Sequence, residues 1–104
     1  MARKKPPPDP DPPPPLRLVP GTQFRRDVER QKARGKDLAK LADVVETIRA
    51  RRPLDARHRD HALSGEWKGR RDCHVEPDWL LIYGVHGSEL RLYRTGTHSD
   101  IFGR

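Results

Sequence analysis

Three histidines, one aspartate and one arginine lie at strand ends and turns within the last 44 residues of this 104-residue chain. They are His61, His74, Asp78, Arg94 and His98. Histidine transfers protons near neutral pH because its unperturbed pKa is about 6.5. Arginine suits a phosphate group because its guanidinium stays charged and offers a fixed fork of donors.

Two aromatic residues of the same region, Trp79 and Phe102, are candidates for holding an unstacked base. The whole set suits RNA cleavage without a metal ion. The catalyst of that reaction must deprotonate a ribose 2′-OH, stabilise charge on the phosphorane and protonate the 5′-oxygen. Each aromatic residue also has a structural alternative: Trp79 opens an apolar run and would pack in the core, and Phe102 would cover a sheet edge.

Arg94 places a condition on this hypothesis. It shares its alternation with Leu90 and Leu92, so a regular strand would turn all three toward the core. We therefore expect Arg94 to lie at a strand end or beside a β-bulge, which changes the side-chain alternation.

The charge of the chain favours a polyanionic partner. The formal net charge is +7 and the pI is about 10.2. Cys73 is the single cysteine, so no intrachain disulfide is expected, and no apolar run approaches the roughly 20 residues of a membrane helix. We expect a soluble cytoplasmic protein with no membrane contact. A structural zinc site needs four ligands, but the chain has one cysteine and only one histidine pair with the short spacing of zinc ligands, His58 and His61. We therefore also expect no metal and no cofactor.

The composition divides the chain into a tail (residues 1–15) and one domain (residues 16–104). The tail holds eight of the eleven prolines, which lack a backbone donor and fix φ. We expect it to be a disordered, extended segment, and its removal leaves a charge of +6 on the domain.

The domain is expected to have the element order β-α-α-β-β-β. A short strand at residues 16–19 precedes two helices, at about 22–34 and 37–52, and the second carries apolar residues at helical spacing. Three strands are expected at 66–75, 79–83 and 89–95, joined by hairpin turns. The sequence thus predicts an α+β fold in which an antiparallel sheet packs against an N-terminal helical hairpin.

The segment HALSGEWKGRRDCHVEPDW, together with the later RTGTHSDIF, resembles the C-terminal half of RelE-superfamily toxins, in particular the YafQ branch. The resemblance is strong over this half, is one of pattern and position over the helical hairpin, and does not include the tail. It implies a RelE-like fold and a type II toxin of bacteria. Such a toxin is a ribosome-dependent endoribonuclease that cuts mRNA in the ribosomal A site, contacts ribosomal RNA and is neutralised by an acidic antitoxin.

The same resemblance assigns roles to residues. We take His61, His74, Asp78, Arg94 and His98 as catalytic candidates, with the acid and base roles of the histidines left undivided. The substrate-binding candidates are Trp79, Phe102, Lys68 and Arg71. Two other functions stay open: a non-catalytic toxin of the same fold, like ParE, and a small basic RNA-binding or ribosome-binding domain.

Overall fold

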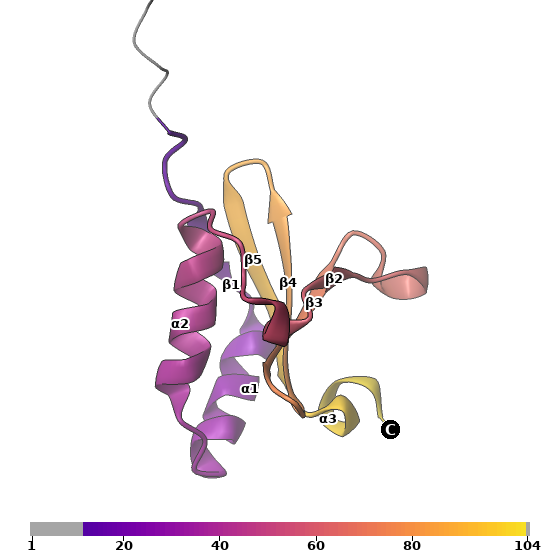
Figure 1. The fold of residues 1–104 in the computed structure, drawn as a ribbon. Helices are drawn as coiled ribbons and strands as arrows, with labels where there is room; N and C mark the ends of the chain where they lie inside the picture. Colours follow the sequence, from indigo (N-terminus) through magenta and orange to yellow (C-terminus); the bar gives the residue numbers. More distant parts are fainter. Residues whose placement is uncertain (1–11, 104) are drawn as a thin grey trace, which may run out of the picture.

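The computed structural model describes residues 12–103, and within them two helices cover one face of a five-stranded sheet (Figure 1). The strand order is β1-β5-β4-β3-β2. The strands are β1 (Arg17–Pro20), β2 (His61–Ala62), β3 (Arg71–Glu76), β4 (Trp79–His86) and β5 (Glu89–Gly96). The helices are α1 (Thr22–Ala33), α2 (Leu38–Arg49) and a short α3 (His98–Phe102), with single 3-10 turns η1 (Ala56–His58) and η2 (Gly65–Trp67). The predicted α+β class is confirmed.

The helical hairpin forms where the sequence predicts it. Gly35, with a φ of +79°, lies just beyond the end of α1 in a left-handed conformation that favours glycine. Asp37 then caps α2, because its carboxylate accepts a hydrogen bond from the amide of Ala39 at 3.0 Å. The buried stripe of α2 consists of Leu41, Val44, Val45 and Ile48.

The sheet differs from the prediction in two places. Strand β1 runs parallel to β5, so the sheet is mixed, although β2 to β5 pair antiparallel. The predicted strand at 66–75 begins only at Arg71. Gly65 and Gly69 adopt positive φ values of 66° and 90°, so residues 65–70 form a turn and a loop, and the two-residue strand β2 pairs with β3 instead.

Each face of the sheet carries its own apolar cluster. The larger cluster lies under α1 and α2 and includes Leu81, Tyr83, Leu90 and Leu92. The smaller one lies on the opposite face and consists of Leu80, Ile82 and Ile101, with Leu63, Trp67, Tyr93 and Phe102 packed against it. The predicted central strand is therefore buried on both faces, and α3 covers part of the second face.

A β-bulge in β5 reverses the direction of Arg94. Leu92 pairs with Tyr83, but Arg94 pairs with Ile82, so Tyr93 is an additional residue opposite β4. Arg94 therefore points to the same face as Ile82, the face that carries the smaller cluster. The condition set by the sequence for Arg94 is met.

The expectation for the tail falls largely on residues 1–11, which lie outside the described residues. Pro12 to Pro15 are exposed and belong to no helix or strand, and the carbonyl of Pro14 accepts a hydrogen bond from Arg51 at 3.0 Å. Within residues 12–103 no helix has the length and apolar character needed to cross a membrane.

Candidate active site

Asp78 and His98 form a hydrogen-bonded pair at one end of the sheet. Asp78 lies in the turn between β3 and β4, and His98 is the first residue of α3. The Asp78 Oδ1 atom accepts hydrogen bonds from the His98 ring at 2.6 Å and from the His98 backbone amide at 3.0 Å. These two bonds lower the pKa of the Asp78 carboxyl from its ordinary value. The carboxylate therefore fixes both the position and the tautomer of the imidazole.

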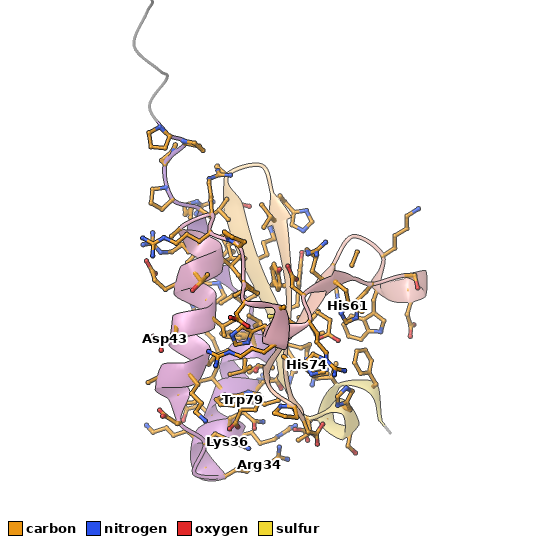
Figure 2. All side chains as sticks on the ribbon, viewed as in Figure 1. Arg34, Lys36, Asp43, His61, His74 and Trp79 are labelled. Carbon is orange, nitrogen blue, oxygen red and sulfur yellow. The ribbon has the colours of Figure 1, made fainter. Side chains whose placement is uncertain are left out.

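The other two predicted histidines lie beside His98 and around a buried carboxylate. The rings of His74 and His98 are 5.7 Å apart. His61 lies opposite Asp72 in the β2–β3 pair, with its Nε2 atom 3.8 Å from the Asp72 carboxylate. Figure 2 shows His61 and His74 on the side of the sheet away from α2. Three histidines that are 13 to 37 residues apart in the sequence thus share one surface.

All three histidines have the same hydrogen-bonding arrangement. In each ring Nδ1 faces an oxygen that can only accept: the Arg59 carbonyl for His61, the Pro77 carbonyl for His74 and the Asp78 carboxylate for His98, at 2.7, 3.1 and 2.6 Å. Nδ1 must therefore carry the hydrogen. With this tautomer Nε2 is the atom that accepts a proton from a substrate, which is the arrangement that a general base needs.

Helix α3, which carries His98, is anchored by Asp100. The Asp100 carboxylate accepts hydrogen bonds from Arg34 at 2.5 and 2.9 Å and from the amide of Thr97 at 2.9 Å. Thr97 caps α3 in return, by accepting from the Asp100 amide at 3.0 Å. The Arg34 guanidinium is the main reason that the pKa of Asp100 lies far below its ordinary value. Asp100 is therefore ionised at physiological pH, and α1 holds α3 through it.

Arg94 reaches the same end of the sheet. Its Nε donates to Asp27 Oδ2 at 2.7 Å, and its side chain is 21% exposed. A longer contact of 3.4 Å joins Nη2 to the carbonyl of Asp100 in α3. The guanidinium is therefore fixed near the helix that carries His98 and keeps part of its surface exposed.

A hollow of about 480 Å³ lies beside His98 and has aromatic walls. It is lined by Glu66, Trp67, His98, Ile101 and Phe102. The rings of Trp67 and Phe102 meet edge to face at 5.5 Å, and the guanidinium of Arg70 lies 5.4 Å from the Trp67 ring and 4.1 Å from that of Tyr93. Aromatic and guanidinium groups of this kind stack with unpaired bases.

Three predicted substrate-binding residues lie apart from this hollow. Trp79 is 1% exposed in the helix-side cluster and its indole N–H donates to Thr95 Oγ1 at 2.9 Å, so we correct its placement from the substrate surface to the core (Figure 2). Arg71 pairs with Tyr83, so it points to the helix side, where it donates to Asp60 at 3.2 Å. Lys68 is exposed in the loop between η2 and β3.

Three residues of the site were missed in the sequence. Trp67, Arg70 and Asp72 all fall within the strand predicted at 66–75, and the sequence selects none of them as a site residue, yet Asp72 is only 5% exposed. The loop at 65–70 turns Trp67 and Arg70 toward Phe102 and Tyr93. The only local signal of this loop in the sequence is its two glycines, Gly65 and Gly69. A glycine in the sequence does not by itself reveal that its φ is positive, as it is at both positions.

Burial of Asp72 gives the site a pH-dependent cost in stability. Burial raises the pKa of Asp72 above its ordinary value of 3.8, against the opposing charges of His61, His74 and His98. Between 3.8 and the raised pKa the folded state holds the proton more tightly than the unfolded state, so stability falls as pH rises through that window. At neutral pH the ionised carboxylate destabilises the fold, and below 3.8 this difference vanishes.

Asp72→Asn is therefore expected to raise the melting temperature at pH 7, and the gain is expected to shrink as the pH falls toward 4. The measurement is thermal unfolding of both proteins at several pH values between 4 and 7.5. A melting temperature for Asp72→Asn below that of the unmodified protein at pH 7 would show that pairing with the histidines outweighs the cost of burial.

Comparison with known proteins gives a consistent result. Residues 16–103 match the family model described as a bacterial toxin of type II toxin–antitoxin systems, YafQ. The chain is 48% identical over 82 residues to the mRNA interferase toxin YafQ of Escherichia coli strain K12, a match that covers 78% of this chain and 89% of that protein.

Solved structures agree with the sequence match. The crystal structure of YafQ from E. coli strain BL21(DE3) superposes with a TM-score of 0.81 at 42% identity and covers 85% of this chain and 99% of that one. YafQ in the E. coli DinJ–YafQ toxin–antitoxin complex gives a TM-score of 0.79 at 43% identity, with 85% of this chain and 98% of that chain covered.

Proposed function

The chain belongs to the YafQ family of toxins from bacterial type II toxin–antitoxin systems, and we propose that it cleaves mRNA on the ribosome by metal-independent acid–base catalysis. The observation that carries this proposal is the convergence of His61, His74 and His98 on one surface, each with its Nδ1 atom on an accepting oxygen. A non-catalytic toxin or a simple RNA-binding domain would not need three histidines oriented alike.

His98 is the main proton-transfer residue in this proposal. Its Nε2 takes the proton of the ribose 2′-OH, whose oxygen attacks the adjacent phosphorus and displaces the 5′-oxygen of the next nucleotide. Asp78 holds the ring through Nδ1 and stabilises the positive charge that the ring gains. The products are a 2′,3′-cyclic phosphate and a 5′-hydroxyl.

The departing 5′-oxygen needs a proton, and His61 is the best candidate to supply it. The Asp72 carboxylate lies 3.8 Å from its Nε2 and is placed to pair with the protonated ring. His74, adjacent to His98 and two residues from Asp72, lies beside the proposed position of the phosphate. Arg94 stabilises the charge that develops on the phosphate oxygens.

A base next to the scissile phosphate enters the hollow beside His98. Phe102 and Trp67 offer ring surface there, and Arg70 extends it. Stacking of this kind contributes about 1–3 kcal/mol per base and bends the strand toward the in-line geometry that 2′-OH attack requires. Lys68 is exposed and directly follows η2, which carries Trp67, so its ammonium group can contact the phosphate backbone of the bound RNA.

The proposed partners are mRNA in the ribosomal A site, ribosomal RNA and an acidic antitoxin, all met in the bacterial cytoplasm. The charge of +7 supports contact with RNA. The E. coli YafQ structure with DinJ supports an antitoxin partner. Expression of the toxin is expected to arrest bacterial growth, and co-expression of the cognate antitoxin is expected to restore it.

Ribosome dependence is tested in a purified translation system. We expect cleavage of a translated mRNA at discrete codons, poor cleavage of the same RNA without ribosomes, and no cleavage where a single 2′-deoxynucleotide replaces the scissile ribose. The readout is the mapped 5′-ends and the cyclic phosphate on the upstream fragment. Efficient cleavage of free RNA would reject the ribosome requirement, and cleavage at the deoxynucleotide would reject 2′-OH attack.

A further inference from the structure

Among residues 12–103, the carboxylate of Asp27, on α1, is the only charged partner of the Arg94 side chain. Asp27 is 0% exposed and lies in the middle of α1. A fully buried carboxylate is costly unless donors surround it. Asp27 meets this condition through three donors: Arg94, the Thr95 amide and Gln23.

The position of Asp27 follows from the end of β1. Strand β1 pairs with β5 only as far as Leu92, so the edge of β5 beyond that residue has no neighbouring strand. Asp27 occupies this edge: its Oδ2 accepts the Thr95 amide at 3.1 Å and the Arg94 Nε at 2.7 Å, and its Oδ1 accepts Gln23 Nε2 at 3.0 Å. The Asp27 carboxylate therefore accepts the Thr95 amide, which has no strand partner on this side, and also holds Arg94 beside the bulge.

The contact uses one side of the guanidinium. Nε and, at 3.4 Å, Nη2 face Asp27, whereas Nη1 is not engaged by it. A guanidinium held by its Nε side cannot rotate freely about its last torsions, so Nη1 is presented in one direction. Catalysis by fixed charge depends on such orientation before the substrate arrives.

We propose that Asp27 is a positioning residue for the RNA-cleavage reaction, which acts through Arg94 by holding the guanidinium toward the scissile phosphate. This inference rests on the proposed function, because it requires Arg94 to act on the phosphate. Asp27 itself touches no substrate. Its loss should therefore slow the cleavage step and leave binding of the toxin to the ribosome nearly unchanged.

The test is a double-mutant cycle measured by single-turnover cleavage on ribosomes, with ribosome affinity and melting temperature followed in parallel. Asp27→Asn is expected to reduce the cleavage rate by roughly 10²-fold, the effect of a small misplacement of a catalytic group. In an Arg94→Ala background the same change is expected to cost no more than about twofold, because the group on which it acts is gone.

The matched control is Gln31→Leu, a change at a position of α1 that is 1% exposed and whose amide atoms lack a hydrogen-bond partner among the described residues. It should leave the cleavage rate unchanged. An equal loss from Asp27→Asn with and without Arg94 would overturn the positioning role and assign Asp27 to folding alone. Full activity of Arg94→Ala would instead reject the proposed role of Arg94, a separate result.

Arg94→Lys keeps the inference testable if Asp27→Asn does not fold. Lysine retains the charge but has no Nε–Nη fork, so a protein with Asp27 intact is expected to lose about as much activity as Arg94→Ala. Near-normal cleavage by Arg94→Lys would show that charge alone suffices and would overturn the requirement for orientation by Asp27.

Discussion

Replacement of His98 by alanine is expected to slow RNA cleavage by roughly 10²- to 10⁴-fold, the usual contribution of a positioned general acid or base. The expected loss falls on the chemical step. His98 is exposed on α3, which is anchored independently by Asp100, so the change should leave the fold intact. The measurement is single-turnover cleavage on ribosomes, with affinity for the ribosome determined separately.

The matched control is His86→Ala. His86 is also exposed, but it lies at the end of β4, where its Nε2 contacts the Tyr93 hydroxyl at 2.9 Å, outside the cluster of three histidines. Its loss should leave cleavage within about twofold of the unmodified protein. If His98→Ala also stays within a few-fold, the main proton transfer belongs to His74 or His61. Asp78→Asn should then show a correspondingly small effect.

The long-range pattern of the fold was predictable because it depends on periodicity. The stripe of α2 and the alternation in the first half of β5 follow from residues whose burial repeats at fixed spacing, and β4 follows from a continuous apolar run. The parallel pairing of β1 with β5 has no such signal, because a four-residue strand pairs in either direction according to where the helices return the chain.

The candidate site was predictable in its residue types but not in its support. The side-chain chemistry of the three histidines, Asp78 and Arg94 indicated a site for proton transfer and phosphate contact. Of these residues only Asp78 lies in a turn, whereas His61, His74 and Arg94 belong to β2, β3 and β5 and His98 begins α3. Asp27 was not found, because it lies 67 residues before Arg94 in a helix whose sequence is otherwise ordinary. The bulge at Tyr93 was inferred only as a condition on Arg94, since sequence alternation alone does not reveal where a strand gains a residue.

Trp79 shows how chemistry and burial have to be separated. The sequence offered both base stacking and core packing for this residue, and a tryptophan at a strand start fits either. The structure gives it 1% exposure, with its indole N–H bonded to Thr95 Oγ1, which in turn donates to the carbonyl of Leu80 at 2.7 Å. Half-buried Trp67, which was not selected from the sequence, has the position suited to stacking.

Trp79→Ala is accordingly expected to lower the free energy of unfolding by about 3–5 kcal/mol, the usual cost of removing a large buried ring. That loss is a large part of the 5–15 kcal/mol typical of a domain. Trp79→Phe should lose less stability than Trp79→Ala and should cleave RNA at nearly the normal rate per folded molecule.

Trp67→Leu should change stability only slightly. It should instead weaken RNA binding by the roughly 1–3 kcal/mol that one stacked base contributes. Urea unfolding and single-turnover cleavage of the three variants separate the two roles, and a well-folded Trp79→Phe with greatly reduced cleavage would return Trp79 to the substrate surface.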